Sequence, residues 1–511
     1  MQGWFQDEGF RGRVRPASRF HQRARCASLV RTARRERARS GRRQVALLQP
    51  PRSRAAAWPR GVDTSKRSEV PEPSSRLRIE GDAWIIRGAA GVRGFLAPPA
   101  DKSLAHRALL LAALADSPST VRHLSGAEDV VRTLEALHQL GVRSEAGPDG
   151  LRLRGVGLRG LRAPQAPIDC GNSGTTMRLL CGLLAAQPFA SQLFGDASLS
   201  RRPMQRLAAP LRAMGARVHC LGEEGRPPLQ IEAAPELRGG VHTIAVDSAQ
   251  VRSALLLAGL YARGPTRLRP AGQARDHLER MLRALGVRLE AEADGLVLEP
   301  GGASWSGFVF EVPGDLSAAA FFVAGAMSPR SGELQVEPVG LNPGRQRYLE
   351  LLQGAGARLE TRPGPSRLGE PTGAFTVRGP LRSGMELGGA DVVRCIDEIP
   401  ALVAACAAAG VSATVHDAGE LRRKESDRIA GLVQLLRAFG VAAVERPDGF
   451  HLEAGARLRP ARVSSQNDHR LAMAAAILAL SADGESRIDT VDCVRTSYPD
   501  FATDFARLAD A

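Results

Sequence analysis

The feature that most constrains the fold of this chain is a local pattern that recurs at intervals of 70 to 84 residues. Each copy is an amphipathic helix that ends at a glycine, which supplies the left-handed backbone of a helix C-terminus, followed by the start of a strand. The glycines of the five copies are Gly141, Gly215, Gly286, Gly356 and Gly440. Solenoid repeats are shorter, roughly 20 to 50 residues. The spacing therefore predicts a small α/β unit that is repeated.

A sixth helix, FARLADA at 505–511, ends the chain about where the next glycine would fall. Strand-like pieces such as LRLRGVGL (151–158) and GLVLEP (295–300) lie between the repeat helices, so each unit should hold several strands and one or two helices. Six units divide naturally into three plus three. A length of 511 residues with 43% hydrophobic content agrees with two domains, each with its own core.

The net charge of +15 is concentrated at the N-terminus. Residues 1–70 hold 18 Lys or Arg and five Asp or Glu, so residues 71–511 carry only +2. The basic arm has the composition of a disordered segment. It could be a nucleic-acid-binding tail, an arginine-rich leader, or upstream sequence misread as coding. We favour the last interpretation, or a dispensable extension.

The seven cysteines are scattered, with no CxxC pair and no zinc-like spacing to histidine. This pattern argues against a disulfide framework and favours a reducing compartment. Apolar runs such as 401–411 are too short to span a bilayer, and no secretory signal is evident. We therefore expect a cytoplasmic protein.

Polar and charged segments precede several apolar helices. The segment ELRRKESDR (420–428) puts seven charged side chains into nine positions. Four others are DCGNSGTTMRLL, GDASLSRRPMQRL, DSAQVRSALLL and NDHRLAMAAAIL, which begin at residues 169, 195, 247 and 467. Singly, each is most simply a polar helix cap or a solvated charged face. Together they predict helix N-termini that converge on a polyanion.

Lysine is rare and unevenly placed. Only Lys66, Lys102 and Lys424 are lysine among 69 Lys plus Arg, and the last two lie in the densest motif-like segments. Lysine, unlike arginine, readily shifts its pKa on burial. Their positions suggest a functional need for a proton donor or a compact cation.

Ten segments together resemble the 5-enolpyruvylshikimate-3-phosphate synthase (EPSP synthase, 3-phosphoshikimate 1-carboxyvinyltransferase) family. They are DKSLAHRALLLAALA, GNSGTTMRLL, GDASLSRRPMQRLAAPLRAMGA, DSAQVRSALLLAGL, RDHLERML, VPGDLSAAAFF, IDEIPALVAA, ELRRKESDRI, NDHRLAMA and TSYPDF. They run in family order from about residue 84 to the C-terminus. Each alone is weak, but the set is specific.

The resemblance implies an α/β fold, an inside-out pseudo-symmetric barrel with three βαβαββ units in each of two domains. Residues 79–99 should join 313–511 in the first domain, and 100–312 should form the second. Residues 1–78 should be the basic extension, which we expect to be disordered.

The resemblance also implies the reaction. The family transfers the enolpyruvyl group of phosphoenolpyruvate to the 5-hydroxyl of shikimate 3-phosphate and releases phosphate, with no metal or organic cofactor. The two substrates bring roughly five to six negative charges at neutral pH. Desolvating so many charges requires matching cations and oriented N–H groups.

Site residues follow position by position from the resemblance. The residues expected to bind shikimate 3-phosphate are Lys102, Ser103, Arg107, Ser248, Ala249, Gln250, Asp397 and Lys424. The residues expected to bind phosphoenolpyruvate are Lys102, Gly174, Arg202, Gln250, Arg428, Arg470 and Arg495. The expected catalytic groups are Asp397, as the base for the 5-hydroxyl, Glu425, as the proton donor to the methylene carbon, and Lys102, as the alternative donor.

Two positions depart from the family pattern. Ala274 stands where the family often has a phosphate-binding serine, so Arg275 or backbone donors would have to compensate. Arg495 stands where some members carry lysine. The resemblance also implies sensitivity to glyphosate, because insensitive members carry alanine at the position of Gly174.

Two other functions fit these residues less well. UDP-N-acetylglucosamine enolpyruvyl transferase shares the fold, but its reactive-loop cysteine has no evident counterpart here. Nucleic-acid binding by the globular part is disfavoured, because only 4% of residues are aromatic and the positive excess lies in the arm. We expect a monomer that binds small-molecule substrates, no membrane and no metal.

Overall fold

The structure is a computed structural model that describes residues 76–234, 236–270, 272–300 and 303–510. Residues 1–75, most of the expected extension, lie outside the described residues. Leu77 and Arg78, which the prediction placed in that extension, form strand β1 (Leu77–Ile79) and pair with β2 (Ala83–Arg87). Leu77 is ordered there because its side chain is buried in a hydrophobic core.

Within the described residues the strands form six four-stranded sheets of one topology. In each sheet an edge strand runs parallel to its neighbour, and the other pairings are antiparallel. Three sheets have the orders β15 (Val309–Glu311)–β4 (Ser119–Arg122)–β6 (Gly150–Arg154)–β5 (Arg143–Gly147), β7 (Ile168–Asp169)–β8 (Ser191–Phe194)–β10 (Leu229–Glu232)–β9 (Arg217–Cys220), and β11 (Arg238–Thr243)–β12 (Arg263–Arg269)–β14 (Gly295–Leu298)–β13 (Leu289–Glu292). The other three are β3 (Gly94–Leu96)–β16 (Leu334–Gly340)–β18 (Thr372–Arg378)–β17 (Arg358–Pro363), β19 (Met385–Leu387)–β20 (Ala413–Val415)–β22 (Gly449–Leu452)–β21 (Ala443–Arg446), and β23 (Arg462–Ser464)–β24 (Glu485–Asp489)–β2–β1.

Each sheet is accompanied by one almost fully buried helix and one amphipathic helix. The buried helices are α2 (Lys102–Ala113), α4 (Gly174–Leu184), α6 (Ala249–Gly259), α8 (Leu316–Gly325), α11 (Ile399–Ala409) and α13 (His469–Ser481). The amphipathic helices are α3 (Glu128–Gln139), α5 (Gln205–Ala213), α7 (His277–Ala284), α9 (Arg347–Gly354), α12 (Arg428–Ala438) and α14 (Phe501–Asp510). A further short helix, α10 (Gly389–Cys395), precedes α11. The buried helices consist mainly of alanine and leucine, and a helix that is apolar all round belongs inside a core.

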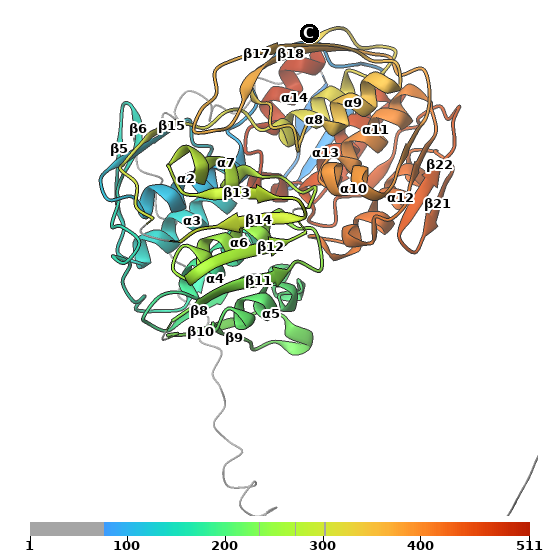
Figure 1. Cartoon of the computed structure of the whole chain (residues 1–511). Helices are drawn as coiled ribbons and strands as arrows, with labels where there is room; N and C mark the ends of the chain where they lie inside the picture. The colour runs from blue at the N-terminus through green and yellow to red at the C-terminus, as the bar shows by residue number, and fades with distance from the viewer. Residues whose placement is uncertain (1–75, 235, 271, 301–302, 511) are drawn as a thin grey trace, which may run out of the picture. The chain divides into compact units, whose positions relative to one another are not determined.

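The buried helices form two hydrophobic cores. α2, α4 and α6 contribute to a core whose residues all lie between Ala100 and Val312. α8, α11 and α13 pack together in the other core, which takes its residues from Leu77–Leu96 and Leu316–Ala509 (Figure 1). The chain therefore changes cores between 96 and 100 and again between 312 and 316.

The predicted fold class, with six βαβαββ repeats, is confirmed. Its division into domains 79–99 plus 313–511 and 100–312 stays a prediction, which the two cores support. No helix in the described ranges is long and apolar enough to cross a membrane.

The five repeat glycines close α3, α5, α7, α9 and α12 with a left-handed backbone. Their φ angles are 89° at Gly141, 95° at Gly215, 84° at Gly286, 108° at Gly356 and 87° at Gly440. After α3, for example, the N–H of Gly141 donates to the carbonyl of His138 and the N–H of Val142 to that of Leu137. These bonds satisfy carbonyls at the helix end that would otherwise lack partners.

Gly286 allows a test of this conformation without a steric clash, because a Cβ added there would meet no atom within 4 Å. We expect Gly286→Ala to lower the free energy of unfolding by about 1 kcal/mol, since an L-residue is strained at positive φ. Gly354, at the end of α9, is equally open but has no positive φ. Gly354→Ala is the control and should leave stability unchanged or raise it by up to about 1 kcal/mol. Urea unfolding of both variants measures the difference, and equal effects would contradict the argument.

Candidate functional site

The buried helices begin around a cavity of about 260 Å³ that both cores help to line. Its lining includes Lys102 and Ser103 of α2, Gly174 and Thr175 of α4, Ala249 and Gln250 of α6, Ser317 of α8, Asp397 just before α11, and His469 and Arg470 of α13. The predicted convergence of helix N-termini is therefore confirmed. Side chains cap five of these helices: Asp101 on α2, Ser173 on α4, Ser248 on α6, Asp315 on α8 and Asp468 on α13.

Positive charge dominates the lining. Among the described residues around the cavity, eleven are Lys or Arg and seven are Asp or Glu, which leaves a formal excess of four positive charges. The N-terminal ends of the buried helices add partial positive charge in the same place. Such a site favours an anionic ligand.

The segment ELRRKESDR contributes charged residues both to the protein surface and to the cavity lining. Arg422 points to the protein surface, where it contacts Asp427 at 2.7 Å and Glu445 at 2.8 Å. Glu420, Arg423, Lys424, Glu425 and Arg428 line the cavity. The chain turns here through a 3₁₀ helix (Gly419–Arg423), and Asp427 then caps α12 by accepting from the N–H of Ala430 at 3.0 Å. The turn therefore leaves Arg422 and Asp427 outside the cavity lining, whereas the other five charged residues of the segment line it.

Arg428 is the most buried charge of this segment, with only 1% of its side chain exposed. Its Nε lies 2.8 Å from Asp468 Oδ2, and its Nη2 lies 2.6 Å from Glu425 Oε2. Asp468 also accepts from the hydroxyl of Ser426 and from the N–H of Arg470. Asp468 thus joins the start of α12 to the start of α13 and fixes the guanidinium of Arg428 at the cavity wall.

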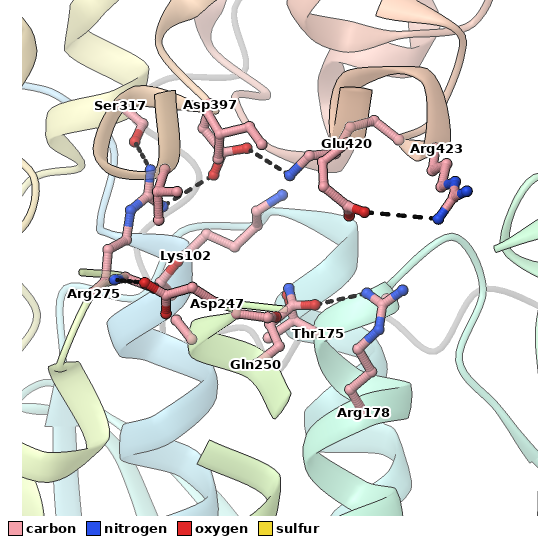
Figure 2. A pocket seen from close by; sticks show the side chains of 18 of the residues that line it. Lys102, Thr175, Arg178, Asp247, Gln250, Arg275, Ser317, Asp397, Glu420 and Arg423 are labelled. Carbon is pink, nitrogen blue, oxygen red and sulfur yellow. Dashed lines mark hydrogen bonds and ion pairs between the residues drawn. The ribbon is translucent and has the colours of Figure 1, made fainter. Parts of the chain in front are cut away.

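Asp397 is surrounded by cations. Its carboxylate lies 3.0 Å from Arg275, 3.4 Å from Lys424, 3.8 Å from Arg428 and 3.9 Å from Arg470. Burial alone would raise the pKa of Asp397, but Lys424, Arg470 and the other two arginines hold it well below its usual range. Figure 2 shows Arg275 directed toward this carboxylate. The carboxylate of Asp397 is therefore ionised at neutral pH.

Glu425 is held in a similar way. Besides Arg428, it lies 3.5 Å from the Nη1 of Arg202. Burial would raise the pKa of Glu425, whereas Arg428 and Arg202 keep it well below its usual range. The ligand-free carboxylate is consequently ionised and has no proton to donate.

The remaining predicted residues at the cavity come mostly from the core formed between residues 100 and 312. Lys102 Nζ lies 2.8 Å from Asp129 Oδ2. Arg107 is buried and donates to the hydroxyl of Ser253 at 2.9 Å, and burial lowers its pKa to about 10. Arg202 donates to the side chain of Asn172 at 2.6 Å. Ser248 and Ala249 also line the cavity, where Ser248 caps α6.

Of the two positions that depart from the family pattern, Ala274 lies at the cavity and Arg495 does not. Arg495 is exposed on a 3₁₀ helix (Asp492–Thr496) and is not among the lining residues. Ala274 lines the cavity beside Arg275, whose guanidinium lies 3.0 Å from Asp397 and 3.0 Å from Glu398.

Several charged residues of the lining were not predicted as site residues from the sequence. They are Asp129, Arg178, Arg206, Arg345 and Glu420. Arg178 had a usable signal, because it follows Gly174 by four residues and such residues share a helix face. Arg206 and Glu420 lie in two of the segments quoted above, but nothing local predicts their 2.5 Å ion pair, which joins residues 214 positions apart.

Comparison with known proteins gives a consistent result. The family model described as EPSP synthase (3-phosphoshikimate 1-carboxyvinyltransferase) matches residues 86–505. The 3-phosphoshikimate 1-carboxyvinyltransferase of Geobacter metallireducens is 42% identical over 421 residues, which cover 82% of this chain and 97% of that protein. The enzyme of the same name from Acidithiobacillus ferrooxidans is 45% identical over 422 residues, covering 82% and 96%. A solved structure of EPSP synthase from Acinetobacter baumannii superposes with a TM-score of 0.73 at 37% identity and covers 84% of this chain and 98% of that one.

The buried pair of Arg428 and Asp468 should be a large determinant of stability. We expect Asp468→Asn to lower the free energy of unfolding at pH 7 by about 3 kcal/mol, because the buried guanidinium of Arg428 keeps Glu425 but loses the carboxylate that binds its Nε. Asn can still cap a helix, so the loss isolates the charge. Asp427→Asn is the matched control, since Asp427 also caps a helix and pairs with an arginine but is 41% exposed. Its cost should stay below about 1 kcal/mol.

The stabilisation by the Arg428–Asp468 pair should depend on pH in a direction set by the pKa of Asp468. Burial alone would raise the pKa of Asp468, but Arg428 lowers it below the ordinary value. The stabilisation is therefore complete at neutral pH and is lost as the pH falls below about 4. Urea unfolding should show the gap between wild type and Asp468→Asn closing over that range. A gap that is independent of pH would contradict the assignment.

Proposed function

This chain belongs to the EPSP synthase family, and on that premise we propose how its cavity performs the family's reaction. The enzyme transfers the enolpyruvyl group of phosphoenolpyruvate to the 5-hydroxyl of shikimate 3-phosphate and releases phosphate, a step of aromatic amino acid biosynthesis. The assignment of residues rests on one observation: the motif positions, Arg495 excepted, line a single cavity with excess positive charge. The direct test is phosphate release, which should require both substrates.

Shikimate 3-phosphate is assigned to the side of the cavity formed by α2 and α6. Lys102, Ser103 and Arg107 of α2 and Ser248 to Gln250 at the start of α6 contribute donors. Ala274 has no side-chain donor, and we assign its missing role to Arg275, whose guanidinium lies at the cavity beside Asp397. Lys424 and Asp397 face these groups from the other core. All of these residues belong to one chain, which supports a monomer as the active unit.

Phosphoenolpyruvate is assigned to Lys102, Gly174, Arg202, Gln250, Arg428 and Arg470. In the ligand-free site the carboxylates of Glu425 and Asp397 are the anions nearest to Arg202, Arg428 and Arg470. The carboxylate and phosphate of the substrate would compete with them for these arginines. Binding therefore exchanges internal anions for substrate anions, and fewer new charges have to be neutralised.

Two carboxylates divide the proton transfers. Asp397, kept ionised by its four cations, accepts the proton of the 5-hydroxyl. The hydroxyl oxygen of shikimate 3-phosphate attacks the enolpyruvyl carbon at the same time. Glu425 donates a proton to the methylene carbon. The resulting methyl group loses one proton back to the ionised Glu425 as the C–O bond to phosphate breaks, which restores the methylene of the product. Glu425 must be protonated before it can donate. Substrate anions neutralise Arg202 and Arg428, and the pKa of Glu425 then rises, so that it takes up a proton.

Glu425→Gln should therefore lower kcat by at least about 100-fold while the Kd for shikimate 3-phosphate changes little. The control is Glu420→Gln, which removes a charge from the same lining but no proposed proton donor, and should lower kcat much less. Calorimetry in buffers of different ionisation enthalpy should detect proton uptake when phosphoenolpyruvate joins the binary complex of wild type, but not of Glu425→Gln. A kcat within a few-fold of wild type would reject Glu425 and make Lys102 the next candidate.

Glyphosate should inhibit the enzyme in competition with phosphoenolpyruvate. A Cβ at position 174 would lie 2.7 Å from the Nη1 of Arg178 and 3.1 Å from that of Arg202, so an added methyl must displace these guanidiniums. Overpacking of this kind typically costs about 1–3 kcal/mol, or roughly 5- to 150-fold in affinity. Gly174→Ala should raise the inhibition constant by that factor and retain most turnover. Wild-type activity that is unchanged in millimolar glyphosate would contradict this assignment.

A further inference from the structure

Arg178 carries a buried charge that the residues around it do not neutralise. Its residue is only 6% exposed, and in the described part of the chain no carboxylate lies within ion-pair distance of it and its Nε has no hydrogen-bond partner. Burial, together with repulsion from Arg206 and Arg202, lowers the pKa of Arg178 to about 9. A buried cation without a carboxylate partner costs stability. Its presence therefore calls for a functional explanation.

The hydrogen bonds of Arg178 lead to Gln250. The Nη1 of Arg178 donates to Gln250 Oε1 at 2.6 Å, and Gln250 Nε2 donates to the hydroxyl of Thr175 at 2.9 Å. Figure 2 shows Arg178 directed toward Gln250, with Thr175 beside it. A guanidinium can only donate, so Gln250 must turn its oxygen toward Arg178. The amide NH₂ is then directed to Thr175 and the start of α4, and one of its two hydrogens remains for a ligand.

The same guanidinium stands at the start of α4. Its Nη1 is 2.7 Å from the position that a Cβ of Gly174 would take, and the Nη1 of Arg202 is 3.1 Å from that position. Two guanidiniums thus flank the helix N-terminus, whose partial charge is also positive. Among the described residues, Arg202 has a carboxylate within ion-pair distance, Glu425 at 3.5 Å, whereas Glu425 and Glu420 attract Arg178 only at longer range.

We propose that Arg178 is a positioning residue for the phosphate end of phosphoenolpyruvate: it orients the Gln250 amide so that its NH₂ faces the anion, and it adds positive charge beside Gly174. This inference rests on the proposed assignment of Gly174 and Gln250 to phosphoenolpyruvate. Arg178 acts through Gln250 and through the field at the start of α4, and it takes no part in proton transfer.

A purely structural role makes the opposite prediction for stability. If Arg178 only tied α4 to α6, its removal would lower the melting temperature. If it is an uncompensated charge kept for an anion, Arg178→Met should leave the Tm of the ligand-free protein unchanged or raise it. Stabilisation by added inorganic phosphate should be smaller in Arg178→Met than in wild type.

Kinetics test the route through Gln250. Arg178→Met should raise KM for phosphoenolpyruvate by about 10- to 100-fold, the range of a hydrogen bond to a charged group, with little change in KM for shikimate 3-phosphate. Arg178→Lys, which keeps the charge, should recover part of the loss. Arg178→Met should add much less in a Gln250→Met background than in wild type. Arg212→Met, which removes an exposed arginine of α5 outside the cavity, is the control for net charge and should match wild type.

The outcomes distinguish a failure of the inference on Arg178 from a failure of the proposed function. If wild type releases phosphate but Arg178→Met has an unchanged KM for phosphoenolpyruvate, or a lower Tm with full phosphate stabilisation, the inference is wrong and the proposed function stands. Fully additive effects of Arg178→Met and Gln250→Met would likewise reject positioning through the amide. If wild type releases no phosphate with both substrates present, the proposed function itself fails.

Discussion

The electrostatic constraint behind this site is the convergence of buried helix N-termini, whose partial positive charges repel each other. Three of the capping side chains are aspartates that also bind an arginine. Asp101 and Asp315 both contact Arg345, while Asp468 contacts Arg428. Each aspartate thus satisfies N–H groups at a helix start and holds a guanidinium at the same cavity. Helix geometry and the charge of the site are therefore set by the same residues, and neither can change alone.

Arg345 shows how this constraint links the two cores. Asp101 starts α2, and Asp315 starts α8, immediately after the two points where the chain changes cores. The backbone N–H of Lys102 also donates to Asp315 at 3.2 Å. A single buried guanidinium consequently fixes both connections and, with them, the position of Lys102. Further out, Arg206 and Glu420 pair across the cavity, as do Arg202 and Glu425. Substrate anions that compete for these cations would change the contacts between the cores as well as the charge of the site.

The sequence allowed the repeat to be predicted because its signals are local. A glycine at the end of an amphipathic helix is visible in about ten residues, and the left-handed φ at Gly141 or Gly440 confirms it. Capped helix starts such as that of α4 are equally local, so their convergence could be predicted once they were numerous. Three of the six sheets in the described residues are instead closed by distant pairs: β15 pairs with β4, β16 with β3, and β2 with β24, across about 190, 240 and 400 residues of chain. Sequence periodicity contains no information on such pairs. For the same reason it could not show which charges of 420–428 line the cavity, or that no carboxylate of the described residues lies within ion-pair distance of Arg178.

The scarcity of lysine gains a physical meaning at the cavity. Lys102 and Lys424 both line the cavity, and each lies beside a carboxylate, Asp129 at 2.8 Å and Asp397 at 3.4 Å. A guanidinium binds carboxylate or phosphate through a planar fork, which suits a fixed contact such as Arg428 to Asp468. An ammonium is a compact charge with rotatable donors, and it can pass from one anion to another as bonds change. Burial lowers the pKa of Lys424, although Asp397 opposes the shift, so its proton is held less firmly than that of any arginine nearby would be. In a chain that otherwise uses arginine almost everywhere, two of the three lysines line the cavity, where the proposed mechanism requires a cation that can follow moving charge.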